Sequence, residues 1–230
     1  MKPYRSLPID ECGEPLVSLE GRGFFLTTPH PYQAFGAPYG SAQPWTARRS
    51  VAEALSNALL RLKAEHPDWT FRIFDAYRPN AIQAFMVIHE FKSLSGGRSP
   101  DAVPLDEAQI LWERTYRIWA EPSDDPASPP PHSTGAAIDL TLCTRDGVDV
   151  PMGSPIDENS DRSLPDYFLQ KDPALHSHRQ ILLKVLEAQG FERHPEEWWH
   201  FSLGDQMWAF TRQSKDAIPP IARYGRADLL

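Results

Sequence analysis

The spacing of apolar residues predicts three helices in the first half of the chain. Between residues 51 and 62 they recur every three or four positions, which is the period of an amphipathic helix that ends near residue 67. Ser50, followed three residues later by Glu53, predicts a capping box at the start of this helix. Similar patterns predict a helix from Asn80 to about Phe91 and another over residues 105–119.

Short stretches of alternating or β-prone residues predict strands between and after these helices. They lie at residues 23–27, 69–75, 136–143, 198–203 and 207–211. Asp146 and Gly147 predict a hairpin turn into residues 148–150, and a last helix is expected from about 174 to 188, closed by Gly190. Early helices and late strands favour an α+β fold, a compact single domain with a mainly antiparallel sheet flanked by helices.

The chain length of 230 residues favours one domain with additions at its ends. We expect residues 1–38 to form an irregular N-terminal arm packed on the domain, residues 39–212 to form the main domain, and residues 213–230 to form a C-terminal tail. The chain has 23 prolines, about twice the usual share, which predicts many loops. The run EPSDDPASPPP over residues 121–131 is one of them.

Composition and charge exclude several classes of function. The 23 basic residues against 31 acidic ones leave a net charge of −8 with no basic stripe, so we expect no nucleic-acid partner. No apolar run approaches the roughly 18 residues of a membrane span, so none is expected. Residues 1–15 lack the apolar segment of a secretory signal, which favours a cytoplasmic location. The pattern of residues gives no indication of an oligomeric state.

The two cysteines, Cys12 and Cys143, are too few for a disulfide framework or a cysteine-based zinc site. A single disulfide bridge between them is the alternative, but we expect two buried thiols. The residues that can carry chemistry are instead histidines and carboxylates in the C-terminal half, together with one arginine.

His132 and Asp139 stand seven residues apart on either side of Gly135. On a flat strand this odd separation would place them on opposite faces. Gly135 permits a turn or bulge that brings His132 back over the strand that carries Asp139, so that both side chains can reach one metal. An ordinary loop histidine and an aspartate at a strand end remain the alternative.

Glu197 and His200 belong to the sequence Glu-Glu-Trp-Trp-His-Phe over residues 196–201. Their separation of three residues would place them on one face of a helix, but the adjacent tryptophans favour a strand. Glu197 then lies at the strand entrance and His200 within it, so that one binds a metal and the other is free for proton transfer. The alternative is a Trp pair in the core and a solvated glutamate.

Arg78 lies in the sequence Asp-Ala-Tyr-Arg-Pro over residues 75–79, at a predicted corner between a strand and a helix. A guanidinium group there can stabilise negative charge that develops on an oxygen. It can equally be paired with Asp75 for structural reasons.

These residues together have the composition of a catalytic zinc site. Such a site takes three protein ligands and leaves one position to water, with a carboxylate beside the metal as base. His132, Asp139 and His200 would be the ligands of one zinc ion per chain, Glu197 the base, and Arg78 the electrophilic group.

The motifs occur in an order that resembles the D-alanyl-D-alanine dipeptidases, the zinc D,D-dipeptidases of the vancomycin-resistance type, which are related to the D,D-carboxypeptidases. They are YRP at 77–79, HSTGAAIDLTL at 132–142, PMGSPID at 151–157 and EWWHF at 197–201. The resemblance covers about residues 39–203. The tandem tryptophan before the last histidine is more similar to the dipeptidases than to the carboxypeptidases.

The resemblance implies a fold shared with D,D-carboxypeptidases and hedgehog-type domains, with a small dipeptide as the substrate. It also implies a zinc ion held by His132, Asp139 and His200, with Glu197 as general base and Arg78 stabilising the transition state. Residues 39–212 would then be the catalytic domain. The chain departs from the family at Pro130, where a serine is common two residues before the first zinc histidine, and this bears on which dipeptide is preferred.

Three other interpretations remain open. The first is a D,D-carboxypeptidase or other cell-wall peptidase that acts on longer peptides, which the missing export signal disfavours. The second is a non-catalytic binding module that contains zinc, which the presence of Glu197 and Arg78 disfavours. The third is a metal-free protein in which the histidine and aspartate positions are coincidental.

Overall fold

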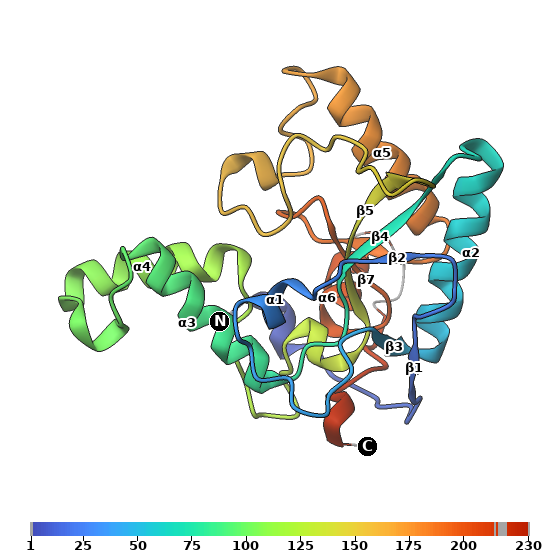
Figure 1. Ribbon diagram of the computed structural model, residues 1–230. Helices are drawn as coiled ribbons and strands as arrows, with labels where there is room; N and C mark the ends of the chain where they lie inside the picture. The colour runs from blue at the N-terminus through green and yellow to red at the C-terminus, as the bar shows by residue number, and fades with distance from the viewer. Residues whose placement is uncertain (1, 214, 216–219, 230) are drawn as a thin grey trace.

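A five-stranded sheet forms the centre of the molecule in the computed structural model, which describes residues 2–213, 215 and 220–229 (Figure 1). Its strands, in spatial order, are β2 (Phe25–Leu26), β4 (Trp69–Asp75), β5 (Ala137–Thr144), β7 (His200–Ser202) and β6 (Glu192–Arg193). Only the β2–β4 pairing is parallel, and the other three are antiparallel. The prediction of an α+β fold with a mainly antiparallel sheet is confirmed.

Two long helices cover the sheet and enclose the main core. The helices α2 (Arg49–Glu65) and α5 (Pro173–Glu187) contact one another, and each also contacts a strand of the sheet. The apolar side of α2 that the sequence predicts is buried there, with Leu55 and Leu62 fully excluded from solvent. Strand β5 is buried along nearly its whole length, which suits its position in the middle of the sheet. A small sheet of β1 (Leu16–Ser18) and β3 (Thr46–Arg48) lies beside α2.

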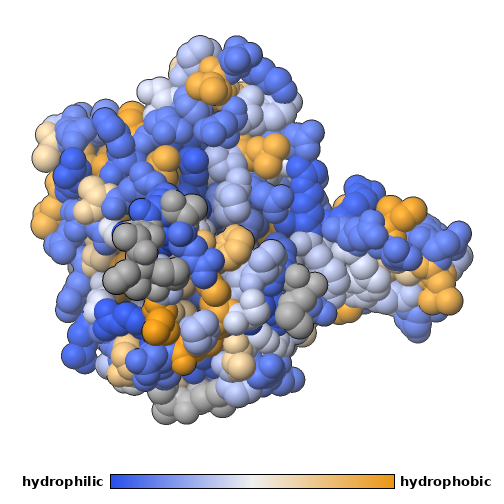
Figure 2. All heavy atoms as spheres, turned by 180° about the vertical axis from the view of Figure 1, so that it is seen from behind, coloured by the Kyte–Doolittle hydropathy of each residue, from blue (hydrophilic) through white to orange (hydrophobic). Residues whose placement is uncertain are grey.

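The helices α3 (Asn80–Leu94) and α4 (Leu105–Ile118) form a pair that projects from the body of the molecule (Figure 1). Phe91 and Leu111 are buried in a small cluster of their own between these helices. The view from behind shows the same projection, with single hydrophobic side chains among hydrophilic ones (Figure 2). The base of the pair lies near Arg78, because α3 begins two residues after it.

Short helices complete the structure. They are α1 (Pro31–Ala34), α6 (Gln206–Arg212), η1 (Pro3–Ser6), η2 (Pro100–Ala102), η3 (Pro131–Thr134), η4 (Asp161–Ser163) and η5 (Ala227–Leu229). The N- and C-terminal segments meet around the fully buried Arg48, whose guanidinium group binds the Glu11 carboxylate and the backbone oxygens of Thr134 and Gly225. None of the helices in the described ranges is both long and apolar enough to cross a bilayer.

The structure corrects two expectations about helix ends. Residues 207–211 are part of helix α6 rather than a strand, and the Asp205 side chain caps this helix by accepting a hydrogen bond from the Trp208 amide. Ser50 is not a capping residue, because α2 already begins at Arg49 and the Ser50 hydroxyl donates to the Glu14 carboxylate instead. The local sequence did not show where either of these two helices begins.

Two further expectations are wrong in part. After the turn at Gly147 the chain does not form a second strand, since only Asp149 makes a bridge, to Cys143. Both thiols are free as expected, but only Cys143 is buried; Cys12 is exposed in the N-terminal segment. Within the expected tail, residues 214, 216–219 and 230 lie outside the described residues.

Candidate metal centre and catalytic cavity

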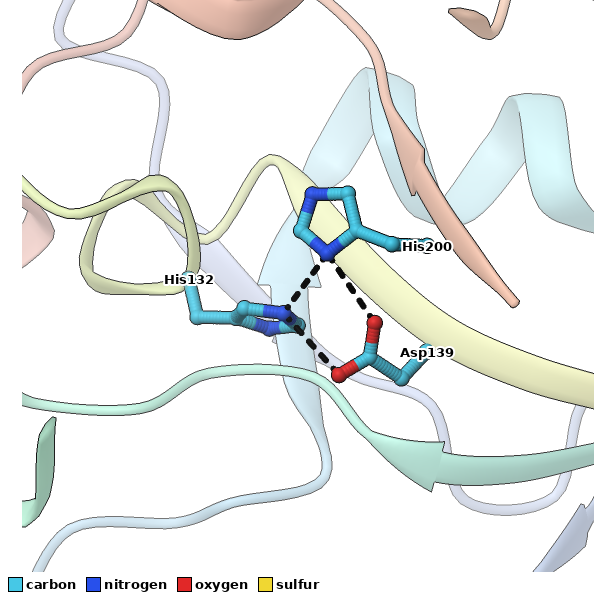
Figure 3. A group of neighbouring side chains, drawn as sticks. All are labelled: His132, Asp139 and His200. Atoms are coloured by element: carbon cyan, nitrogen blue, oxygen red, sulfur yellow. Dashed lines mark hydrogen bonds and ion pairs between the residues drawn. The ribbon is translucent and has the colours of Figure 1, made fainter. Parts of the chain in front are cut away.

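The sheet brings two of the predicted ligands together, and a turn supplies the third (Figure 3). Asp139 on β5 is paired directly with His200 on the neighbouring strand β7. His132 lies in η3, which ends at Gly135 with a left-handed φ of 71°. The turn that a glycine permits therefore carries the imidazole of His132 back over Asp139, as the sequence predicts. Figure 3 shows the three side chains pointing toward one another.

The distances between the three ligand atoms suit a single metal ion. His132 Nε2 lies 3.2 Å from His200 Nδ1 and 3.1 Å from Asp139 Oδ2, and His200 Nδ1 lies 3.0 Å from Asp139 Oδ1. In a tetrahedral zinc site with bonds of about 2.0–2.1 Å, neighbouring ligand atoms are roughly 3.3 Å apart. The three observed distances involve both oxygens of Asp139, and with one atom from each residue the donor atoms all lie within 4.8 Å of one another, which is compatible with one shared ion.

The hydrogen bonds behind His132 fix the form of its ring. His132 Nδ1 lies 2.8 Å from the Ala76 carbonyl oxygen, which can only accept, so this nitrogen carries a proton. In the neutral ring Nε2 then presents a lone pair toward Asp139 and His200. This arrangement of an inner proton donor and an outer lone pair is the usual one for metal-binding histidines.

His200 has the corresponding support on its outer nitrogen. Its Nε2 lies 3.3 Å from the Ser202 hydroxyl, which donates to Asp205 at 2.9 Å. Because the Ser202 proton is directed to Asp205, the hydroxyl oxygen accepts from His200 Nε2, and Nδ1 is left with a lone pair. Two imidazole lone pairs and a carboxylate thus face one another inside the protein. Such a donor set is repulsive on its own and fits a cation.

Asp139 is ionised in this setting. Burial alone would raise its pKa, but without a metal ion the rings of His132 and His200 can take up protons, and their charges and hydrogen bonds then hold the pKa of Asp139 well below its usual range. A carboxylate ligand of this kind reduces the net charge of a divalent ion from two to one. The side chain is 2% exposed, so this negative charge has little contact with water.

Glu197 lies beside the three residues but outside their triangle. Its Oε2 is 3.9 Å from His200 Nδ1 and its Oε1 is 3.8 Å from His194 Nδ1. Burial raises the pKa of Glu197 to about 8, and the Asp139 carboxylate adds to the effect. A buried carboxyl group with a raised pKa, next to a metal site, has the properties of a general base.

Arg78 is paired with Asp75 and also lies at the edge of the three converging side chains. Its Nε donates to Asp75 at 2.8 Å and its Nη1 donates to Gln83 at 2.8 Å, so the pairing with Asp75 is real. Its Nη2 nevertheless lies 3.4 Å from Asp139 Oδ2, at the edge of the ligand triangle. The guanidinium group is also stacked between the rings of Tyr32 and Trp119, each about 4.9 Å from it.

Comparisons with known proteins show the family to which the chain belongs. The family model described as D-ala-D-ala dipeptidase matches residues 27–219. The chain is 41% identical to a D-alanyl-D-alanine dipeptidase of Synechocystis sp. over 99% of its own length and 98% of that protein. The chain belongs to the D-ala-D-ala dipeptidase family. It is therefore a peptidase.

Other relatives in the dipeptidase family match over shorter stretches. The D-alanyl-D-alanine dipeptidase of Escherichia coli is 40% identical over 31% of this chain and 37% of that protein. The enzyme of the same name from Enterococcus faecium is 40% identical over 35% of this chain and 40% of that protein. Among solved structures, the LdcB LD-carboxypeptidase covers 76% of this chain and 67% of its own, with a TM-score of 0.42 and 17% identity.

This member of the dipeptidase family has a cavity in front of the ligand triangle, and some of its walls were not predicted. The cavity is lined by the five predicted residues and also by Lys2, Tyr4, Asp157 and His194. Asp157 ends the motif PMGSPID, which the family resemblance identified without assigning the aspartate a role. The other three lie in segments with no periodic pattern, so the sequence held no signal for them.

Asp157 is the most unusual of these additional residues. It has a positive φ of 65°, which is uncommon for an aspartate, and its carboxylate accepts a hydrogen bond of 2.9 Å from the Tyr32 hydroxyl. Burial, together with the nearby charge of Asp139, raises the pKa of Asp157 to about 8. A buried acid held in this way is suited to meet a positively charged group of a ligand.

Proposed function

We propose that the protein is a zinc-dependent dipeptidase that hydrolyses D-alanyl-D-alanine or a similarly small dipeptide. One observation carries this proposal: the donor atoms of three side chains approach one another to 3.0–3.2 Å, and a buried glutamate outside this group lies less than 4 Å from one of them. Membership of the D-ala-D-ala dipeptidase family supports the choice of substrate.

The donor set fits zinc better than the harder divalent cations. Two imidazole nitrogens and one carboxylate oxygen are common zinc ligands, whereas magnesium and calcium prefer oxygen alone. His132, Asp139 and His200 would hold the ion, and the hydrogen bonds to Ala76 and Ser202 would keep the two rings in position. When bound, zinc supplies a Lewis acid and lowers the pKa of a coordinated water from 15.7 to about 7.

Glu197 moves the proton in this proposal. Its carboxylate takes a proton from the attacking water, and the resulting carboxylic acid later gives that proton to the nitrogen of the leaving amine. The glutamate is neither an ion-pair partner of Arg78 nor one of the three converging ligands, so its oxygens are available for this transfer. Its high pKa in the buried site makes it a stronger base than a solvated glutamate.

Arg78 stabilises the oxygen that becomes negative as the peptide bond is attacked. The group is already oriented by Asp75 and Gln83, so little reorganisation is needed when charge develops. Asp157 is the acid that we assign to the ammonium group of the substrate, because the other cavity carboxylates already have roles in metal binding and proton transfer.

The proposal is tested by metal analysis together with an activity panel. The purified protein is expected to contain one zinc per chain and to hydrolyse D-Ala-D-Ala faster than L-Ala-D-Ala or L-Ala-L-Ala, with little action on a longer peptide that ends in D-Ala-D-Ala. Preference for the longer peptide would make it a D,D-carboxypeptidase. Stoichiometric zinc without hydrolysis of any of the four would make it a binding module and overturn the proposal.

A further inference from the structure

The N-terminal segment forms one wall of the catalytic cavity. Lys2 and Tyr4, on either side of the start of η1, line the same cavity as His132 and Glu197. The segment lies more than 120 residues from these catalytic side chains in the sequence. Its presence there gives the cavity a cation and a phenol that the sequence motifs do not supply.

Specific contacts hold this wall in place. The buried Arg5 donates to Glu121 at 3.2 Å and to the Ser128 backbone oxygen at 2.9 Å, both in the loop that leads to His132. From the other side, the Gln206 amide donates to the backbone oxygens of Arg5 and Leu7. The segment is thus tied to both α6 and the loop before the first ligand, and the positions of Lys2 and Tyr4 are fixed by their neighbours.

Lys2 and Tyr4 have hydrogen-bonding capacity that the protein does not use. Tyr4 is 3% exposed, and no acceptor for its hydroxyl is found among the described residues. Lys2 Nζ makes one long contact, of 3.5 Å, with the Arg117 backbone oxygen, so two of its three N–H groups are available to a ligand. Because the Tyr4 side chain lines the cavity, its hydroxyl is available to a water molecule or a bound ligand.

The charge balance of the cavity indicates which ligand group this is. Asp139, Asp157 and Glu197 make the cavity acidic, and the N–H groups of Arg78 are largely directed to Asp75 and Gln83. Lys2, by contrast, has N–H donors that no group in the cavity uses. Its positive charge favours the ionised form of Glu197, so the ammonium group lies near this carboxylate. An ammonium and a hydroxyl group that converge on one cavity suit a carboxylate.

We propose that Lys2 and Tyr4 bind the free C-terminal carboxylate of the substrate, and that they are specificity-determining residues. This inference rests on the proposed dipeptidase function. A dipeptide would then lie between two fixed charges, with its ammonium group at Asp157 and its carboxylate at Lys2. A substrate whose C-terminus is neutral or extended would leave the Lys2 charge unpaired or press against the η1 wall.

The test compares D-Ala-D-Ala with D-alanyl-D-alaninamide, which has the same shape but no terminal charge. The wild-type protein is expected to favour the acid by roughly 10²-fold in kcat/KM, since the amide leaves the buried Lys2 charge without its partner. Lys2→Gln should raise KM for the acid by about 30- to 100-fold and leave KM for the amide nearly unchanged, while any change in kcat that comes from the proton affinity of Glu197 should be equal for the two substrates. Lys2→Arg should retain most of the preference, and Tyr4→Phe should lose about 10-fold.

The control is Lys63→Gln, which removes an equally charged side chain from the exposed end of α2. Binding of D-Ala-D-Ala and of D-alanyl-D-alaninamide is also measured by calorimetry, in the Glu197→Gln protein with and without Lys2→Gln. This measurement does not depend on turnover. Hydrolysis by the wild type with an unchanged ratio of acid to amide in Lys2→Gln would overturn the carboxylate site and leave the proposed function standing. Lys2-dependent binding of the acid without hydrolysis would overturn the proposed function and leave the carboxylate site standing.

A third result would also overturn the carboxylate site. If Lys2 acted only on the proton affinity of Glu197, Lys2→Gln would change kcat and its pH profile equally for the acid and the amide, with KM unchanged for both. The melting temperature of each variant is recorded with the kinetics, so that a folding defect is recognised as such.

Discussion

Asp139 and His200 face one another on adjacent antiparallel strands, with Asp139 Oδ1 3.0 Å from His200 Nδ1. The sheet register therefore sets two corners of the candidate metal site. A slip of one residue would turn Asp139 to the other face of β5, so the packing that fixes the register also fixes the site. The position of His132, the third corner, does not depend on the register, because a turn outside the sheet holds this residue.

The hydroxyl of Ser202 should tune metal affinity without touching the metal. It accepts from His200 Nε2 and donates to Asp205, so Ser202→Ala removes the group that orients the His200 ring. We expect a loss of roughly 10- to 100-fold in zinc affinity, measured by competition with a chromophoric chelator. Ser56→Ala is the matched control, because its hydroxyl bonds only within α2. Equal affinities in the two variants would show that Ser202 has no such role.

Replacement of Glu197 by glutamine should separate metal binding from turnover. Glutamine keeps the shape of the side chain but cannot accept the proton of the attacking water, so kcat should fall by at least about 10²- to 10⁴-fold. The zinc content should stay near that of the wild type, because Glu197 is not one of the converging ligands. Near-native hydrolysis of D-Ala-D-Ala by this variant would assign the proton transfer to another group.

The metal-free protein should become less stable as the pH rises from about 5 to 8. Burial raises the pKa of Glu197 from 4.5 to about 8, so in this range the folded state holds a proton that the unfolded state has released. Stability then falls with increasing pH, by up to a few kcal/mol. Asp157, with its pKa raised from 3.8 to about 8, contributes in the same direction.

The measurement is the melting temperature of chelator-treated protein across this pH range. Glu197→Gln should reduce the slope, and the double variant with Asp157→Asn should nearly remove it. Asp139 changes stability in the opposite direction, because its pKa is lowered in the folded state. Its contribution to the unfolding free energy is lost only in acid, as the pH falls below its usual pKa of 3.8. A melting temperature that rises between pH 5 and 8 in the wild type would contradict the buried, protonated state of Glu197.

The sequence predicted the central parts of this molecule better than its edges. Strand β4 and helix α4 follow from their apolar patterns within a few residues, and helix α3 follows from the start signal at Pro79 and Asn80. The turn that brings His132 over Asp139 could be inferred because a glycine turn is a local feature. The pairing of Asp139 with His200, 61 residues further along the chain, is not local and was expected only from the residue types and the family resemblance.

Other features depend on contacts between distant segments, and the sequence carried no pattern for them. The strand expected at 207–211 is helix α6, whose cap at Asp205 and contact with η1 outweigh the β-prone composition. Lys2 and Tyr4 reach the cavity only because Arg5 and Gln206 tie the N-terminal segment to it. Single residues in an aperiodic segment give no sign of such long-range packing.

Two substitutions of Arg78 should distinguish its structural from its catalytic effect. Arg78→Ala leaves the buried carboxylate of Asp75 without its main partner, so we expect a loss of about 3–5 kcal/mol in unfolding free energy. Arg78→Lys keeps the charge beside Asp75 but loses the fork that also reaches Gln83 and the edge of Asp139. It should fold more stably than the alanine variant while kcat falls by roughly 10²- to 10³-fold. Wild-type kcat in a folded Arg78→Lys protein would limit Arg78 to a structural role.

Gly135 should be required for the metal site because of both its backbone and its surroundings. Its φ of 71° is unfavourable for other residues, and a Cβ atom there would overlap with the Leu16 side chain on β1. Gly135→Ala should therefore destabilise the protein by about 1–3 kcal/mol and weaken zinc binding, because η3 and His132 must shift. Gly21→Ala is the matched control, since its φ of 72° is the same but no atom lies within 4 Å of the added carbon.

The comparison separates backbone strain from steric overlap. Gly21→Ala should lose only the cost of the left-handed conformation, about 1 kcal/mol, and keep full zinc affinity. Adding Leu16→Ala to Gly135→Ala should restore part of the zinc affinity by making room for the new methyl group. If Gly135→Ala bound zinc as tightly as Gly21→Ala, the turn at Gly135 would not be what holds His132 over Asp139.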